Sequence, residues 1–292
     1  MALFLVVAFG LAWAFCLPLW LGGGLASPAF MICATALMFT PALGVLAVWA
    51  RTRTPFRQWA RETGLTFGPD RRRTLLLMAA AWIGTPLVVA LCLGLSAALG
   101  LVSLDLGGLS LFKQGMEAAG VPVPADASGL LIAQIVFAVV ATPLLNALPV
   151  LGEELGWRGW LLPRLVAARG IPAGLLLSGV IWGVWHFPVT LLGYNYPALG
   201  PWAGPYFVVA CVLLGVTMGW LRLRTGSVWP AVVAHGALNG VAGTSLLLGD
   251  AAAPPNPAVI GVTGLVGWVV LALLGVTLLK LYPVRPAEPA TA

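Results

Sequence analysis

Residues 130–158 read LLIAQIVFAVVATPLLNALPVLGEELGWR. This stretch carries no charge until Glu153, where two glutamates stand side by side and an arginine follows. A run of about 20 mostly apolar residues is long enough to cross a bilayer as a helix. Ionisable groups at the edge of such a run are costly to place in lipid and favour a functional interpretation. The stretch therefore predicts a membrane helix that leads into a polar site.

The composition of the whole chain points to the same surroundings. Hydrophobic residues make up 60% of the sequence and charged residues 8%, whereas about 25% of the residues in ordinary soluble domains are charged. The 13 tryptophans suit the membrane–water interface. The net charge of +6 does not indicate nucleic acid, because most basic residues flank apolar runs. We therefore expect a protein whose partner is the lipid bilayer, with no nucleic-acid partner.

Eight segments are apolar enough to span the membrane, and backbone groups in lipid are satisfied when such segments are helical. We expect an all-α polytopic membrane protein with about eight transmembrane helices, a single helical domain over residues 1–282 and a disordered tail over 283–292. The four cysteines fall inside apolar runs and are expected to be buried core residues. The expected spans are 2–22, 28–50, 74–100, 130–152, 172–193, 205–221, 228–248 and 259–279.

The orientation follows from lysine and arginine, which accumulate on the cytoplasmic side. With eight spans and both termini cytoplasmic, Lys113 is the one basic residue placed outside. The first apolar run lacks the basic start of a signal peptide and is interpreted as a mature helix. We expect a multi-pass protein of the cell (inner) membrane. The richest connection, residues 51–73, contains Arg51, Arg53, Arg57, Arg61, Arg71, Arg72 and Arg73.

Three polar patterns lie in or beside these spans, and each has an ordinary structural interpretation. Glu154 and Arg158 are one helical turn apart, so they are expected to pair, which leaves Glu153 on a different face. A glutamate–arginine pair at a helix end is often only structural.

The two other patterns contain the only histidines of the chain, His186 and His235. Trp182 precedes His186 by one turn, and Asn239 follows His235 by four residues, on the same helical face. Gly236 allows another helix or a ligand to approach closely. A buried histidine alone more often serves the core than catalysis. Because nearly all other membrane positions are apolar, the joint occurrence of the three patterns favours a functional site.

The order EExxxR, an aromatic residue four positions before histidine, and HxxxN resembles the CPBP family of intramembrane proteases, also called the CAAX-protease and bacteriocin-processing (ABI) family. The motifs here are EELGWR from Glu153, WGVWH ending at His186, and HGALN from His235. The resemblance covers about residues 130–245. The family usually has phenylalanine where this chain has Trp182, which keeps an aromatic wall and adds bulk and an N–H donor.

The resemblance implies an endopeptidase that acts on bonds near the membrane surface. Peptide hydrolysis needs an activated water, a stabilised oxyanion and a proton for the leaving amine. Glu153 suits the general base, His186 could orient or help activate the water, and His235 with Asn239 could donate to the oxyanion. Glu154, Arg158 and Trp182 would support them. We expect these side chains to converge in the cytoplasmic half of the membrane.

The same residues leave a metal mechanism open. Glu153, His186 and His235 form a plausible ligand set for a divalent ion such as zinc, with an open position for water. No HExxH motif is present, and Asn239 suits an oxyanion better than zinc. The sequence therefore leaves the cofactor unknown and slightly favours a water activated by glutamate alone.

Two further functions remain beside the protease. One is a non-catalytic immunity or scaffold protein with the same fold, and the other is a proton-coupled transporter that uses the buried acids. The intact set of three motifs favours the enzyme, and the chain lacks the inverted repeats typical of transporters. The expected substrate is a peptide or a membrane-anchored protein, with or without an attached lipid.

Overall fold

The computed structural model describes residues 1–284 and is built from helices. No strand occurs within this range, and the only pairing of extended backbone is an isolated antiparallel bridge between Leu104 and Gly249. The predicted all-α class is therefore confirmed. The predicted disordered tail, 283–292, lies almost wholly outside the described residues.

Four helical stretches are long and apolar enough to cross a membrane. They are α1 (Ala2–Leu21), α2 (Phe30–Thr52), α4 (Arg71–Ala98) and the stretch Pro197–Thr225, which joins η3 (Pro197–Trp202) to α12 (Ala203–Thr225). Shorter apolar helices are α6 (Ser128–Val140), α10 (Ile171–Trp185) and α15 (Leu265–Leu281). These helices make the chain a membrane protein. The count of eight spans and the cytoplasmic termini stay predictions.

Residue contacts divide the chain into two compact units. Of the described residues, the first contains Met1–Met78, Ala147–Val232 and 274–284, and the second contains Ala79–Asn146 and Val233–Leu273. Three helices, α4, α13 (Trp229–Val241) and α15, pass from one unit into the other.

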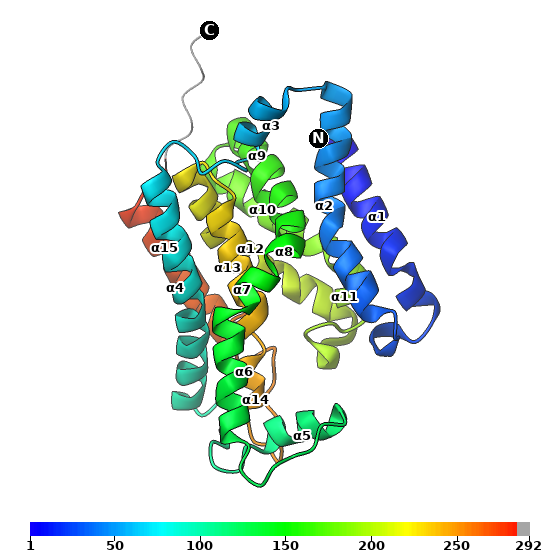
Figure 1. The fold of residues 1–292 in the computed structure, drawn as a ribbon, viewed down its shortest axis with the longest axis vertical. Helices are drawn as coiled ribbons and strands as arrows, with labels where there is room; N and C mark the ends of the chain where they lie inside the picture. Colours follow the sequence, from blue (N-terminus) through cyan, green and yellow to red (C-terminus); the bar gives the residue numbers. More distant parts are fainter. Residues whose placement is uncertain (285–292) are drawn as a thin grey trace. The chain divides into compact units, whose positions relative to one another are not determined.

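In the first unit, α1 lies along α2, and α2 in turn packs against α8 (Ala147–Glu154) (Figure 1). Gly44 permits the first of these contacts, because a Cβ there would lie 2.9 Å from the carbonyl oxygen of Phe4. Phe4 is fully buried and its ring meets that of Trp157 edge-on. Lipid tails are as apolar as these side chains, so the hydrophobic effect does not drive helices together inside a bilayer. Tight packing of this kind holds them together instead.

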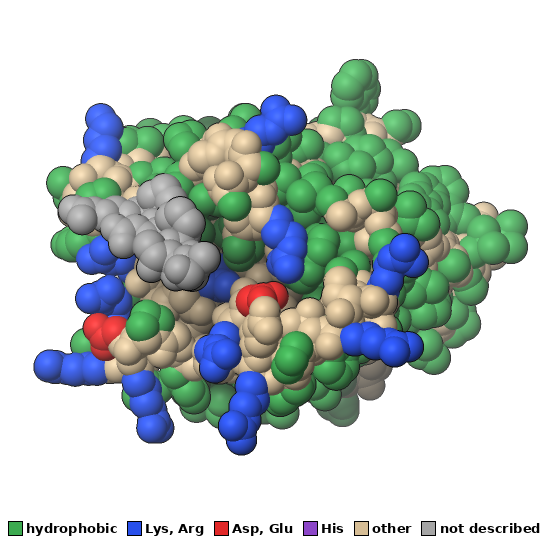
Figure 2. All heavy atoms as spheres, turned by 90° about the horizontal axis from the view of Figure 1, so that it is seen from above, with side chains coloured by type: hydrophobic (Ala, Val, Ile, Leu, Met, Phe, Trp, Pro, Cys, Tyr) green, Lys and Arg blue, Asp and Glu red, His purple; other side chains and the backbone are tan. Residues whose placement is uncertain are grey.

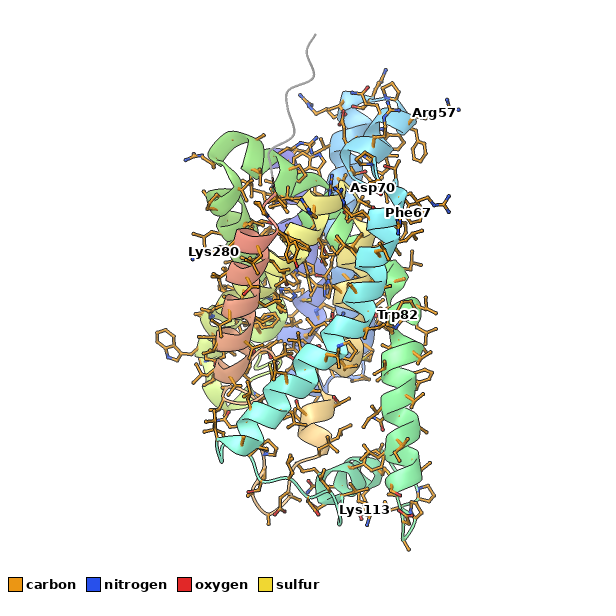
Figure 3. All side chains as sticks on the ribbon, turned by 90° about the vertical axis from the view of Figure 1, so that its left-hand side faces the viewer. Arg57, Phe67, Asp70, Trp82, Lys113 and Lys280 are labelled. Carbon is orange, nitrogen blue, oxygen red and sulfur yellow. The ribbon has the colours of Figure 1, made fainter. Side chains whose placement is uncertain are left out.

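One end of the first unit is strongly basic. The arginines of the connection 51–73, which includes α3 (Phe56–Glu62), are exposed, and Figure 2 shows Lys and Arg side chains spread over this face with few acidic ones. Figure 3 places Arg57, Phe67 and Asp70 at this end. Asp70 begins α4 by accepting a hydrogen bond from the backbone N–H of Arg73 at 2.9 Å. The clustering agrees with the orientation expected from the positive-inside rule.

In the second unit, helices α5 (Ser110–Ala118), α6 and α14 (Thr244–Leu247) enclose a small apolar cluster that includes Leu109, Phe112 and Leu131. Helix α7 (Thr142–Leu145) follows α6. Trp82 on α4 donates its indole N–H to the carbonyl oxygen of Val139 at 2.8 Å (Figure 3). In the loop before α5, hydrogen bonds from Ser110 and from the Gly108 N–H lower the pKa of Asp105. This carboxylate orders the loop rather than forming a site.

Two of the expected spans contain breaks at proline. The segment 130–152 becomes α6, α7 and α8, and Pro143 stands in the first turn of α7. The segment 172–193 becomes α10 and α11 (Phe187–Thr190), with His186 at the junction and Pro188 in the first turn of α11. Proline has no N–H to give to the preceding turn, and it is well tolerated in the first turn of a new helix. The stretch after the glutamate pair is helical as well, as the π-helix η2 (Leu155–Leu161) followed by α9 (Leu162–Arg169).

Candidate active site

The glutamate pair lies at the C-terminal end of α8, inside the first unit. Glu153 is 3% exposed and Glu154 is fully buried. Two glycines that bracket the pair explain how it becomes buried. A Cβ on Gly152 would lie 2.7 Å from the carbonyl oxygen of Met38, and one on Gly156 would overlap Pro41. Small residues four positions apart let helix backbones approach closely, so α8 and η2 press against α2 and cover both carboxylates.

The predicted pair between Glu154 and Arg158 is present. The guanidinium Nη1 of Arg158 donates to Oε1 of Glu154 at 2.8 Å, and both side chains are almost completely buried. Arg158 belongs to the π-helix η2, a helix form that is rare and is frequently found at functional sites. An ion pair buried this deeply needs good geometry, because each charge has lost its water.

Trp182 brings the neighbouring glutamate into the same array. Its indole N–H donates to Oε2 of Glu153 at 2.9 Å, across from α10 to α8. The guanidinium carbon of Arg158 lies 3.9 Å from the centre of the Trp182 ring, well inside the range of a cation–π contact. Trp182 therefore contacts both an acidic residue, Glu153, and a basic one, Arg158. It is itself 2% exposed.

His186 is held one turn further along α10. Its Nδ1 lies 2.9 Å from the carbonyl oxygen of Trp182, and rings of Trp185 and Phe207 pack edge-on against the imidazole. A carbonyl oxygen only accepts, so this contact assigns the proton to Nδ1, and a neutral ring then has Nε2 as its acceptor. The side chain is half-buried. His186 is thus oriented by backbone and aromatic contacts.

A second pair of glycines positions α10. A Cβ on Gly179 would lie 2.6 Å from Cα of Val212, and one on Gly183 would lie 2.6 Å from Cα of Val208. The backbones of α10 and α12 therefore touch, with Trp182 between these contacts and His186 just beyond the second, at the C-terminal cap of α10.

The third motif lies on α13, in the second unit. His235 is 5% exposed and Asn239 is exposed. Gly236 does allow a close helix contact, as expected, because a Cβ there would lie 3.1 Å from the carbonyl oxygen of Pro143. Gly240 similarly sits against Ala138 and Thr142. The structure thus brings Glu153, Glu154, Arg158, Trp182 and His186 together in one unit, and the convergence of His235 and Asn239 with them stays a prediction.

The glycine spacing is the signal that the sequence interpretation missed. Each of the three motifs overlaps a pair of glycines four positions apart: Gly152 and Gly156, Gly179 and Gly183, Gly236 and Gly240. The interpretation recognised this property only for Gly236. The expectation for the cysteines is confirmed, since all four are buried and unpaired with one another.

The predicted metal-ligand set, Glu153, His186 and His235, combines residues of both units and stays a prediction. Among residues 1–284, no three His, Cys, Asp or Glu side chains are grouped closely enough to hold a metal ion. Glu153 and His186 are both engaged with Trp182, through its indole N–H and its carbonyl oxygen.

Comparisons with known proteins address the same region. Residues 128–241 match the family described as type II CAAX prenyl endopeptidase, Rce1-like. Both this match and a curated relative support the CPBP family of CAAX proteases that the motifs predict. The relative is CAAX prenyl protease 2 of Methanococcus maripaludis, 29% identical over 92 residues. That alignment covers 30% of this chain and 34% of the relative, so the chain matches about a third of the relative's length. All three CPBP motifs fall within the matched residues.

Proposed function

We propose that this chain is an intramembrane endopeptidase of the CPBP family that hydrolyses a peptide bond near the membrane surface, with Glu153 as the general base. The family and the relative's name support an intramembrane protease. The observation that carries the proposal is that one residue, Trp182, contacts both Glu153 and His186. Two candidate acceptors for the protons of a water are thereby held in fixed orientation.

In the proposed reaction, a water donates one proton toward Glu153 and the other toward Nε2 of His186. Its oxygen lone pair then attacks the carbonyl carbon of the peptide bond as Glu153 takes the first proton. The carbon–nitrogen bond breaks in the next step, and Glu153 returns the proton to the leaving amine. A positioned base of this kind contributes about 10²–10⁴-fold to the rate.

His235 and Asn239 are proposed as donors to the oxyanion that forms during the attack. Their spacing of four residues puts both on one face of α13. A ring N–H and an amide N–H are donors of the kind that stabilise such an oxygen, and removal of one donor typically costs about 10²–10³-fold in turnover. This role requires α13 to present that face to the same peptide bond as Glu153.

Glu154 and Arg158 are proposed to support the reaction without touching the substrate. Their buried ion pair fixes the turn that follows Glu153, and Arg158 lies over the ring that contacts Glu153. The two adjacent glutamates thus have different tasks.

The proposed substrate is a membrane-anchored protein or peptide whose scissile bond lies near the cytoplasmic surface, and a lipid-modified C-terminus is the first candidate. The relative is named a prenyl protease, and a lipid chain anchors a short peptide at the bilayer where this chain resides. The basic end of the first unit supports a cytoplasmic orientation of that face, with both termini inside and the protein crossing the cell (inner) membrane several times.

The test is turnover of a fluorescence-quenched peptide by purified protein in lipid vesicles. The peptide is offered with and without a farnesyl group on its cysteine. Glu153→Gln is expected to lower kcat by about 10²-fold or more, while Glu117→Gln, an exposed glutamate in the second unit, leaves it unchanged. Turnover is also measured with a metal chelator present, which tests the metal alternative. Equal turnover by Glu153→Gln and wild type would overturn the proposal, and turnover by neither would favour the non-catalytic alternative.

A further inference from the structure

We propose that Trp182 is a positioning residue for Glu153, and that its indole N–H, rather than its aromatic bulk, is what the reaction requires. This inference rests on the proposed function. It goes further because the CPBP motif usually carries phenylalanine here, and phenylalanine has no hydrogen-bond donor.

The hydrogen bond between Trp182 and Glu153 is short and buried, as expected of a contact that orients the carboxylate. The donor and the carboxylate oxygen are 2.9 Å apart, and both side chains are at most 3% exposed. A buried carboxylate is costly unless it accepts hydrogen bonds. The hydrogen bond from the indole to Oε2 restrains the orientation of the Glu153 carboxylate.

Arg158 strengthens this donor. Its guanidinium carbon lies 3.9 Å from the centre of the indole ring, and its Nη1 donates to Glu154 at 2.8 Å. A cation over an aromatic face is attracted to its electrons, and drawing charge from the ring makes the N–H a stronger donor toward an anion. One continuous series of contacts therefore runs from Glu154 through Arg158 and Trp182 to Glu153, across α8, η2 and α10.

The same residue also sets the position of His186. The carbonyl oxygen of Trp182 accepts from Nδ1 of the imidazole, while its side chain donates to Glu153. The glycine contacts of Gly179 and Gly183 hold this part of α10 against α12. The distance between the proposed base and the proposed water-orienting histidine is thus governed by one well-fixed residue.

The direct test compares Trp182→Phe with Trp220→Phe. Trp220 is a matched control, because it is 5% exposed and its indole N–H also makes one hydrogen bond, to the carbonyl oxygen of Tyr282 at 2.9 Å. Both substitutions remove the same atoms from a buried site. We expect Trp182→Phe to lower kcat about tenfold or more with KM unchanged, because a hydrogen bond to a charged group is lost. Trp220→Phe is expected to retain the wild-type kcat.

A spectroscopic measurement keeps the inference testable if Trp182→Phe is too unstable for kinetics. In protein labelled with ¹⁵N at the tryptophan indoles, the signal absent from Trp182→Phe identifies Trp182. Glu153→Ala is expected to shift that signal and to leave the Trp220 signal in place. An unshifted Trp182 signal would overturn the inference.

The outcomes separate this inference from the proposed function. If Glu153→Gln abolishes turnover while Trp182→Phe keeps the wild-type kcat, the inference fails and the protease stands. If Glu153→Gln retains full turnover, the proposed function fails, whatever the result for Trp182.

Discussion

Two ion pairs of the first unit have similar chemistry and opposite surroundings. Arg158 and Glu154 pair at 2.8 Å with side chains 1% and 0% exposed, whereas Arg73 and Asp70 pair at 3.4 Å with side chains 48% and 45% exposed. The exposed pair stands at the start of α4 on the basic end, where water screens it. The charges of the buried pair are excluded from water and are stabilised by protein groups alone. The same residue types therefore indicate membrane topology at the start of α4 and a specific site at Glu154 and Arg158.

The largest expected effect comes from breaking the buried pair. Arg158→Met is expected to destabilise the protein by about 3–5 kcal/mol, because it leaves the Glu154 carboxylate buried without its counter-charge. The measurement is the loss of folded protein during heating in detergent. Glu154→Gln with Arg158→Met together should recover part of that loss, since the remaining charge is then removed. A melting temperature unchanged by Arg158→Met alone would show that the pair is not structurally important.

A smaller effect is expected from the glycines that bury the pair. Gly156→Ala is expected to cost about 1–3 kcal/mol, because the added Cβ would overlap Pro41 of α2. Gly10 in α1 is the matched control, since a Cβ there meets nothing within 4 Å. Gly10→Ala should stabilise its helix by about 0.5–1 kcal/mol. Equal effects of the two substitutions on the melting temperature would contradict the close packing of η2 against α2.

The exposed pair offers the next comparison. Asp70→Ala is expected to cost about 1 kcal/mol, chiefly because the backbone N–H of Arg73 loses its cap at the start of α4. Thermal unfolding beside Asp70→Asn separates the two roles, because asparagine keeps the capping oxygen and removes the charge. If Asp70→Asn were as harmful as Asp70→Ala, the ion pair would outweigh the cap.

The smallest effect is expected from Arg73→Ala. An exposed ion pair contributes about 0–1 kcal/mol, so the melting temperature should scarcely change, and the small change should shrink further in high salt. A loss comparable to that of Arg158→Met would remove the distinction between the two pairs.

Local spacing was enough to predict part of the site. Glu154 and Arg158 are four residues apart, so a helix brings them together whatever its surroundings. The contact between Trp182 and Glu153 could not be predicted in this way, because 29 residues separate them and the contact requires the packing of α10 beside α8. The added N–H of Trp182 was recognised from the sequence, and its acceptor was not.

For the fold, as for the site, the sequence predicted local features and missed those that depend on how the backbone packs. Apolar runs identified the helical segments, whereas residues 130–152 were expected as one span and are divided at Pro143. The π-helix η2 was not foreseen, because its extra backbone register leaves no sequence pattern of its own. The GxxxG spacing around all three motifs was visible in the sequence and explains the close helix contacts after the fact.

The central claim is that the buried array around Glu153 performs peptide hydrolysis. The most direct measurement is kcat for the farnesylated, quenched peptide with wild-type protein and with Glu153→Gln in the same vesicles. The proposal predicts measurable wild-type turnover and a loss of about 10²-fold or more in the variant. Turnover by Glu153→Gln equal to that of the wild type would contradict it.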